Sequence, residues 1–368
     1  MTGLSLACAL AGREAKLGSK QTLIVEPRSA YHQDKTWCYW QQGTTPFDDA
    51  ITHHWSKWSV SSGGKTHTSE HTARPYVRVD SGRFYDIAQR IIGASHAITL
   101  RLGDQAERVQ GDDDGVRIHS QQGVIQAACA IDTRPQSIPQ GTLLQHFLGW
   151  EIDVEADVFD PTTVTLMDFV PGAQDVHFFY VLPFSPRRAL VETTHFSMAL
   201  QSDEDYRREL TDYLQARYGL KHWQITRTEQ GVIPMPRRQP RWAGGDHSRV
   251  IPMGLHADTT KPSTGYCYPH AQDQARRQAE NLLQDKPLQP CAARSKLSRW
   301  FDSVFIGFLE QHPQRAGAVF LALFQRVPPD ALLRFLNDEA SLGDYIQVML
   351  ALPKATFIKQ AFRHAWGA

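Results

Sequence analysis

The first part of the chain has a helical pattern of apolar positions, followed by an unbroken apolar strand. Apolar residues recur three and four positions apart between residues 4 and 11, and glycines at 12 and 18 punctuate the end of this segment. The run TLIVEP at 22–27 predicts a strand buried on both faces, with Glu26 at its carboxyl end. A helix leading to a strand that ends in an acid about 20 residues on is typical of the second half of a dinucleotide-binding βαβ unit.

Gly3 fits the last glycine of the G-x-G-x-x-G turn in such a unit, where the lack of a side chain permits close packing of helix on strand. We therefore expect the first strand and the first two glycines to be encoded in frame upstream of Met1, so that the chain starts roughly a dozen residues late. An ordinary amphipathic N-terminal helix explains the same pattern without a bound dinucleotide.

The middle of the chain changes from a mixed pattern to an extended one. WSKWSV and KTHTSE alternate around Gly63–Gly64 like a β-hairpin, SGRFYDIAQRII predicts a helix, and VIQAACAID predicts a returning parallel strand. From 141 to 235 apolar and polar residues alternate with a period of two, interrupted by one helix, DEDYRRELTDYLQARYG. This alternation predicts a mainly antiparallel sheet, one face of which could cover a bulky ligand.

The last third of the chain is helical. Residues 249–283 predict a strand, a loop and a long helix, and from Leu297 onward the pattern is helical with breaks at prolines. We therefore predict an α/β (α+β) fold with a discontinuous dinucleotide-binding domain. Its parts are residues 1–133 and 245–285, the inserted β-sheet domain is 134–244, and the C-terminal helical region is 286–368.

Composition excludes several classes of function. Among 368 residues, Lys plus Arg number 39 and Asp plus Glu number 39, so the basic surplus typical of nucleic-acid-binding proteins is absent. Five scattered cysteines without C-x-x-C spacing favour a reducing compartment, and the 16 histidines have no ligand spacing, so we expect no metal. No apolar run reaches the roughly 18 residues of a membrane-spanning helix. We expect a protein that is soluble or lies on a membrane surface.

Several blocks, in order along nearly the whole chain, resemble one family. The chain is similar to the bacterial lycopene β-cyclases, flavoproteins related in fold to aromatic hydroxylases of the p-hydroxybenzoate hydroxylase type. The blocks are DTRP at 132–135, LLQHFLGWEI, LMDF, YVLPFSPRRALVETTHFS, EQGVIPMP, KPSTGY, FQRVPPDALLRFL and VMLALP. The missing glycine turn is the clear departure from the family.

The resemblance implies a chemistry without net redox change. Lycopene has no heteroatom, so its ψ-ends can close to β-ionone rings only through protonation, attack by an internal double bond, and loss of a proton. The implied product series is lycopene, γ-carotene and β-carotene, which makes the enzyme an isomerase in carotenoid biosynthesis. The family nevertheless requires FAD in its reduced form, with NAD(P)H or another donor as reductant, because an anionic flavin can stabilise the developing cation.

Two carboxylic acids are candidates for the proton transfer. Glu192 follows Leu190 and Val191 in an apolar strand and matches the family's catalytic glutamate; burial would keep it protonated near neutral pH. A solvent-facing glutamate at a strand end is the alternative. Asp168, in TLMDF, has similar surroundings and could position Glu192 or shuttle protons, unless it is a solvent-facing strand residue.

The loop GLHADTTKPSTGY is the candidate cofactor segment. Its glycines permit close backbone approach, and its last amides precede a helix, where they would face the flavin; an N-capped helix without ligand is the alternative. Glu26 would bind the adenosine ribose, and Trp37 would either line the polyene tunnel or belong to a core. The expected cofactor contacts are Gly3, Glu26, Gly254, Ser263, Thr264 and Gly265.

The C-terminal helices bear on where the protein works. Their apolar runs flanked by Arg fit either an interfacial helix pair or a buried helical cap. Because lycopene resides in the bilayer, we expect a cytoplasmic enzyme associated peripherally with the inner membrane. The competing hypotheses are a flavin monooxygenase or isoprenoid reductase of the same fold, and an inactive carotenoid-binding homologue.

Overall fold

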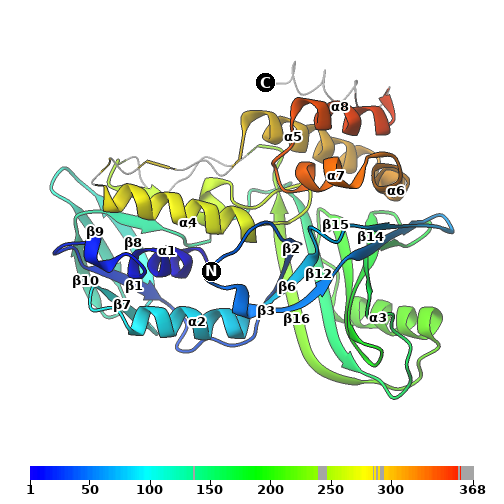
Figure 1. Ribbon diagram of the computed structural model, residues 1–368, viewed down its shortest axis with the longest axis horizontal. Helices are drawn as coiled ribbons and strands as arrows, with labels where there is room; N and C mark the ends of the chain where they lie inside the picture. The colour runs from blue at the N-terminus through cyan, green and yellow to red at the C-terminus, as the bar shows by residue number, and fades with distance from the viewer. Residues whose placement is uncertain are drawn as a thin grey trace.

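The computed structural model describes residues 1–135, 137–238, 247–284, 286, 289–290, 294–354 and 357. It has an α/β part and a large sheet, with helix α3 on one face of this sheet and a layer of C-terminal helices on its other face (Figure 1). The expected boundary positions 244, 245 and 285 lie outside the described residues.

The α/β part is built on two pairs of parallel strands. They are β1 (Thr22–Glu26) with β7 (Ile98–Leu102), and β11 (Ala130–Asp132) with β17 (Val250–Pro252). Three helices accompany them: α1 (Thr2–Ala11), α2 (Ser81–Gly93) and α4 (Tyr268–Leu283). The helix, strand and helix predicted for residues 4–11, 22–27 and 81–92 are confirmed. Each of these segments has an apolar pattern long enough to distinguish a helix from a strand.

A small antiparallel meander adjoins these strands. It consists of β8 (Ala106–Gly111), β9 (Val116–Ser120) and β10 (Gly123–Ala127). The prediction of one parallel strand over VIQAACAID was wrong for its first half. Gly123–Ala127 pairs antiparallel with β9, and only Ala130–Asp132 returns parallel, next to β17.

The large sheet has seven strands in the order β16-β12-β15-β14-β13-β4-β5. Their bounds are β4 (Lys57–Ser62), β5 (Lys65–Glu70), β12 (Leu143–Asp153), β13 (Thr163–Phe169), β14 (Val176–Ser185), β15 (Arg188–Ser197) and β16 (Gln224–Met235). The hairpin at Gly63–Gly64 is confirmed, with φ of 58° and 73°. However, β4 pairs with β13 and so belongs to this sheet, which corrects the assignment of all of residues 1–133 to the dinucleotide-binding domain.

A three-stranded sheet separates two hydrophobic cores. Its strands are β2 (Thr36–Trp40), β6 (Tyr76–Asp80) and β3 (Ile51–Trp55). Along β2 the side chains alternate: Trp37 and Tyr39 pack into the core of the α/β part, whereas Cys38 and Trp40 pack into the core next to the large sheet. Trp37 is therefore a core residue of the α/β part, in contact with Phe84 and Tyr268 rings.

Helix α3 (Asp203–Tyr218) covers the outer face of the large sheet (Figure 1). It begins at the N-cap Ser202, whose hydroxyl accepts from the Asp205 amide, and ends at Gly219 in the left-handed conformation. Leu210 and Leu214 of α3 pack on Val191 of the sheet in a third core. One face of the sheet is thereby closed.

A buried polar cluster also joins α3 to the sheet. His195 bonds through Nδ1 to Asp175 and through Nε2 to Glu209, each at 3.0 Å. Burial alone would lower the pKa of His195, but its two carboxylate partners raise it to about 9. His177, His195 and Glu209 could offer three ligands to a metal ion, yet the two imidazole rings are stacked 4.0 Å apart at 18°. An ion cannot lie in both ring planes, and the hydrogen bonds already account for this cluster.

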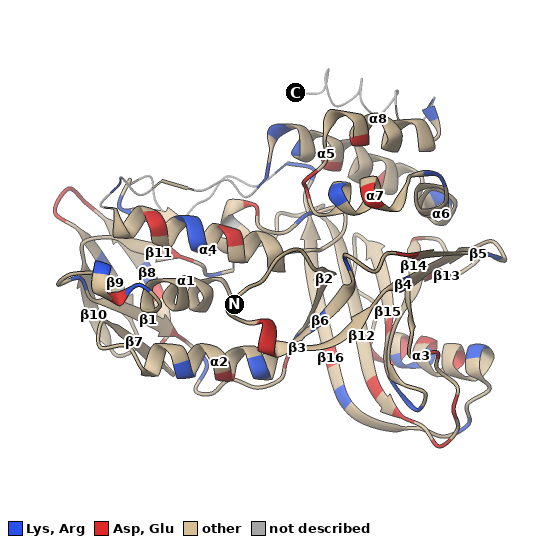
Figure 2. Ribbon diagram, viewed as in Figure 1, with Lys and Arg blue, Asp and Glu red and all other residues tan. Residues whose placement is uncertain are grey.

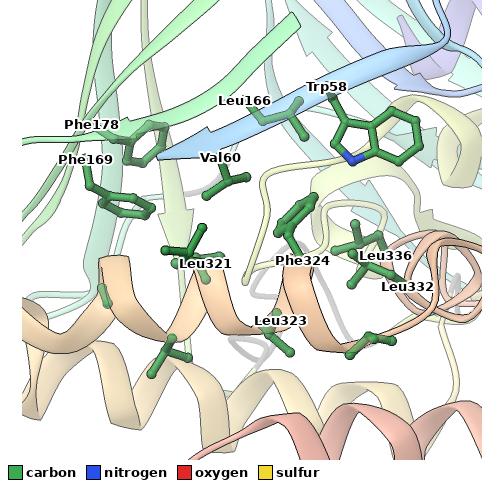
Figure 3. Packing of buried hydrophobic residues seen from close by; sticks show 14 of the residues in the cluster. Trp58, Val60, Leu166, Phe169, Phe178, Leu321, Leu323, Phe324, Leu332 and Leu336 are labelled. Atoms are coloured by element: carbon green, nitrogen blue, oxygen red, sulfur yellow. The ribbon is translucent and has the colours of Figure 1, made fainter. Parts of the chain in front are cut away.

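Four helices form a cap over the other face of the large sheet. They are α5 (Lys296–Gln311), α6 (Ala316–Arg326), α7 (Pro329–Leu336) and α8 (Leu342–Ala351). Figure 3 shows α6 directing Leu321 and Phe324 toward Val60 and Trp58 of the sheet. Gly317 permits this contact, because a Cβ there would lie 3.0 Å from the Phe169 ring. Short 3₁₀ turns complete the chain at Glu14–Lys16, Asp48–Ala50, Gly254–Ala257 and Pro313–Arg315.

Candidate active site

Glu192 lies in a row of four residues that face the cap side of the large sheet. Across the strands, Tyr180 of β14 stands opposite Glu192 of β15, Glu192 opposite Gly149 of β12, and Gly149 opposite Glu229 of β16. A Cβ on Gly149 would lie 2.7 Å from Glu192 Cγ. Only glycine therefore leaves room for two carboxyl groups from non-adjacent strands to meet above the middle strand.

Burial determines the charge state of Glu192. Glu192 and Glu229 are each only 7% exposed. Burial first, and then the charge of Glu229 and a hydrogen bond with it, raise the pKa of Glu192 well above its ordinary value; Arg227 opposes this shift. The protonated form of Glu192 is thus favoured near neutral pH.

Glu229 has the opposite surroundings. Thr36 of β2 donates to Glu229 Oε2 at 2.7 Å, and the Arg227 guanidinium contacts the same oxygen. Arg227 also donates to Thr36 Oγ1 at 2.8 Å, which closes a three-residue ring. Glu229 is thus bound by a cation and a hydroxyl donor, whereas Glu192 beside it has the raised pKa.

A second buried carboxylate anchors this arginine. Glu151 Oε2 accepts from Arg227 at 3.1 Å and from Arg78 at 3.2 Å, and its other oxygen accepts from Arg188 at 2.6 Å. Although burial would raise the pKa of Glu151, the arginines lower it. Arg227 is therefore held between two carboxylates, with its position fixed by both.

Aromatic side chains form the wall beside Glu192. The Tyr76 hydroxyl lies 3.0 Å from that of Tyr180 and 3.5 Å from that of Tyr266. Trp40 packs edge-on against Tyr266, with ring centroids 5.5 Å apart. All four come from the inner core, and burial raises the pKa of each tyrosine, so the wall is neutral. Ring faces of this kind attract cations without supplying a base.

The structure does not bring Asp168 to Glu192. Asp168 accepts a hydrogen bond from Tyr213 at 3.0 Å and lies 3.8 Å from Arg217, and both partners belong to α3 on the outer face. The expectation that Asp168 positions Glu192 was therefore wrong; Glu229 is the carboxyl that meets it. A β-bulge between Thr165 and Asp168 is the reason, because one extra residue turns Asp168 to the opposite face.

The expected cofactor residues lie in two places. Gly3 is at the start of α1, where an added Cβ would meet only Thr133 Oγ1, at 3.7 Å. Gly254 has φ of 73°, and a Cβ there would lie 3.2 Å from Thr2 Oγ1, so this loop abuts the first turn of α1. Glu26 is at the end of β1, but its carboxylate accepts from Arg28 at 2.9 Å and from Tyr31 at 3.3 Å.

The segment before α4 forms a tight turn. The amides of Thr264 and Gly265 donate to the Lys261 carbonyl at 3.1 and 2.8 Å, and the Ser263 hydroxyl donates to Asp302 at 2.6 Å. The expectation that the amides of Thr264 and Gly265 face a ligand is thus not what the structure shows. At Gly265 an added Cβ would lie 2.8 Å from Gln145 Oε1, so the close neighbour of this glycine is a side chain of β12.

Two buried oxygens near this turn indicate whether a polar cofactor fits there. Gln145 Oε1 and Thr260 Oγ1 are buried without a hydrogen-bond partner. Buried polar atoms almost always have partners, so these two fit a bound polar group beside Gly265. The three glycines and the two oxygens are compatible with a dinucleotide that contacts the start of α1 and the 254–265 loop.

A buried ion network ties this turn to the cap. Lys261 is 1% exposed, and its Nζ lies 2.7 Å from Asp338 and 3.1 Å from Asp302. Arg294 contacts Asp302 as well and lies 2.9 Å from Asp258. The network therefore fixes the loop that carries Gly265 against helix α5.

An apolar cavity of about 290 Å³ lies within the cap. Its lining includes Met167 of β13, Thr264 of the turn before α4, and mainly aromatic and aliphatic side chains of α5, α6 and α7. Three further lining residues, Ile346, Met349 and Leu350 of α8, are also exposed, so the cavity reaches the molecular surface at α8. Within the described part of the chain, no helix is long and apolar enough to cross a bilayer.

Sequence reasoning missed Gly149, Glu229, Arg227 and Thr36. The block that contains Glu229, EQGVIPMP, was visible as a motif, but no periodicity shows which strand neighbours which. The features that could have been noticed were a glycine inside the largely apolar strand β12 and an arginine and an acid two residues apart in β16.

Comparisons with known proteins agree on one family and one fold. The family described as "Lycopene cyclase protein" matches residues 1–362. A lycopene beta-cyclase of Pantoea ananas is 25% identical over 315 residues, 82% of this chain and 79% of that protein. Another, from a Paracoccus species, is 27% identical over 225 residues, 57% of this chain and 56% of that protein.

Solved structures with the same fold are more distant in sequence. A geranylgeranyl bacteriochlorophyll reductase-like protein from Thermoplasma acidophilum has a TM-score of 0.59 and 12% identity, covering 97% of this chain and 95% of that one. The flavin-dependent monooxygenase PieE, in complex with FAD and substrate, has a TM-score of 0.59 and 13% identity, covering 98% of this chain and 70% of that one. The predicted fold, that of FAD-dependent monooxygenases and reductases with a large sheet and C-terminal helices, is confirmed.

Proposed function

The chain belongs to the lycopene cyclase family, and on this premise we propose that it is a lycopene β-cyclase. It would close the ψ-ends of lycopene to β-ionone rings, through γ-carotene to β-carotene, without net redox change. Two relatives named lycopene beta-cyclase support the choice of β-ring closure as the reaction. The observation that carries it is a carboxylic acid kept neutral by burial, Glu192, beside a wall of aromatic rings.

The side chains around Glu192 fit each step of such a reaction. Glu192 gives its proton to the terminal double bond, so that a tertiary cation forms and is attacked by an internal double bond. The faces of Tyr180, Tyr76 and Trp40 are neutral and electron-rich, and they suit a cation that must not be captured by a nucleophile. The Glu192 carboxylate is then the base that takes a proton from the ring, which leaves the enzyme unchanged.

We further propose that the chain binds FAD, and that NAD(P)H or another donor keeps it reduced. The flavoprotein fold and the unpartnered oxygens of Gln145 and Thr260 support this. When bound, reduced FAD supplies a negative charge that stabilises the cation. Gly3, Gly254 and Gly265 give room for the approach of the cofactor, whereas Glu26 would bind the ribose only after Arg28 releases one of its oxygens. Ser263, held by Asp302, shapes the turn.

We expect many product molecules for each electron supplied, because ring closure consumes none. Purified protein loaded with FAD would be reduced with a sub-stoichiometric amount of dithionite under anaerobic conditions and given lycopene, and β-carotene would be quantified by chromatography. A monooxygenase would give no product without oxygen, and a reductase would stop at one product for every two electrons. Either of these results would replace the cyclase proposal with the corresponding alternative.

We also propose that the protein works at a membrane surface on the cytoplasmic side, with α8 against the lipid. Leu342 is 73% exposed and Leu350 is 59% exposed, and they share the outer side of α8 with Ile346 and Met349. Figure 2 shows this helix nearly free of charge, whereas α4 carries several charged residues. Because the apolar cavity reaches the surface at α8, a polyene could pass from lipid into the cap without crossing water.

Charges on the outer face of α8 should weaken vesicle binding. Burying one Leu side chain contributes about 1.5–3 kcal/mol, so Leu342→Glu with Leu350→Glu should lower the affinity for phospholipid vesicles by about tenfold or more. Flotation with vesicles measures this. The matched control is Val124→Glu, an equally exposed apolar residue on β10, which should bind as the unmodified protein does. Equal binding of all three proteins would rule out α8 as the lipid contact.

A further inference from the structure

Glu192 is paired with Glu229, although a residue that only donates a proton needs no second carboxyl group beside it. The two residues come from strands separated by β12, and they meet only because Gly149 has no side chain. A lone buried acid would need neither the glycine nor a charged partner. The site instead contains two carboxyl groups beside the guanidinium of Arg227.

We propose that Glu229 is a positioning residue that holds the transferable proton on Glu192 and drives Glu192 to take up a proton again after each ring closure. This proposal rests on the proposed cyclase function. Arg227 and Thr36 occupy Glu229 Oε2, so the shared proton resides on the Glu192 side of the pair. When Glu192 gives up the proton, its O–H bond breaks and a C–H bond forms on the polyene, leaving two adjacent buried carboxylates.

That doubly charged state drives the return step. Two like charges in a dry site repel strongly, and Arg227 compensates only one of them because it also serves Glu151. The repulsion is relieved when Glu192 takes a proton from the carbon next to the cyclic cation, which breaks a C–H bond and forms the ring double bond. No electrons are gained or lost, and the pair again holds one proton.

Other charged or titratable groups in the described part of the chain also face the pair. On the neighbouring elements these are Cys38 of β2, Arg78 of β6, Tyr180 of β14, and Glu151 of β12 with Arg227 of β16. Cys38 and Tyr180 are partly exposed, but desolvation raises the pKa of each and so favours its neutral form. The ionisation of Glu192 is thus set chiefly by burial and by Glu229, against Arg227.

Substitution of Glu229 by Gln tests this. Once Glu229 has lost its charge, the Arg227 guanidinium interacts with Glu192 instead and lowers the pKa of Glu192. The variant should therefore begin to lose activity at a lower pH than the unmodified protein as the pH is raised. We expect cyclisation at neutral pH to fall by about a hundredfold and to recover in acid, whereas Glu229→Asp, which keeps the charge, should restore most of it. The matched control is Glu209→Gln, a part-buried carboxyl of helix α3 on the opposite side of the sheet, which should leave the pH profile unchanged.

Infrared spectroscopy separates this proposal from the cyclase function. A carbonyl stretch of a protonated carboxyl should persist at neutral pH in the unmodified protein, vanish in Glu192→Gln, and titrate at lower pH in Glu229→Gln. These bands need no substrate, so they report on the pair even if the protein closes no rings. An unchanged band and pH profile in folded Glu229→Gln would overturn the proposal while leaving the cyclase function intact.

Discussion

Replacing Glu192 by Gln is expected to abolish ring closure while leaving the fold intact. The amide has nearly the same shape, and Gly149 still leaves room for it, but it has no proton to transfer. Loss of a positioned acid typically lowers a rate by about 10² to 10⁴. Expression in a lycopene-accumulating bacterium followed by pigment chromatography, together with turnover by the purified protein, measures the effect.

Asp168→Asn is the informative comparison for that experiment. Asp168 lies in the same sheet but faces α3, where it contacts Tyr213 and Arg217. It should therefore convert lycopene at nearly the unmodified rate. If Asp168→Asn were inactive and Glu192→Gln active, with both proteins folded, the assignment of the acid to Glu192 would have to be abandoned.

Lys261→Met is expected to cause the largest loss of stability among simple substitutions. Lys261 is fully buried between Asp338 and Asp302, and methionine fills a similar volume without the charge. Removing one partner of a buried ion pair costs about 3–5 kcal/mol, because Asp338 and Asp302 stay buried with one cation fewer beside them. The midpoint and slope of urea unfolding give this change in the free energy of unfolding.

The control for Lys261 is an exposed lysine in a similar pair. Lys57 lies 4.0 Å from Glu70, and both side chains are largely in solvent. Lys57→Met should change the free energy of unfolding by no more than about 0.5 kcal/mol. If the two substitutions had equal effects, the network around Lys261 would not be what holds the 254–265 loop to the cap.

The sequence was sufficient for elements whose pattern is local. The hairpin at Gly63–Gly64, helix α3 and the long helix α4 each have their own periodicity and end signals, and all three are confirmed. The placement of β4 beside β13 was not predictable, because the two strands are about a hundred residues apart and nothing in either one specifies the other.

The candidate site shows the same limit at the level of single residues. Strict alternation from Val164 and Leu166 would put Asp168 on the inner face, and the bulge in β13 reverses it. Glu229 meets Glu192 only through the register of three strands, which no local pattern encodes. Glu192 itself could be predicted, because an acid inside an apolar strand is unusual and the family resemblance gave it a role.

The sharing of β2 between two cores limits how members of this family can be recombined. Five consecutive residues supply Trp37 and Tyr39 to one core and Cys38 and Trp40 to the other, while Thr36 contacts Glu229. A chimera that takes its α/β part from one parent and its large sheet from another must mismatch one side of this strand, wherever the crossover falls. Such chimeras should therefore fold only when both parents have the same residues at these five positions. Substitutions in β2 that alter substrate preference should also alter the packing of the α/β part.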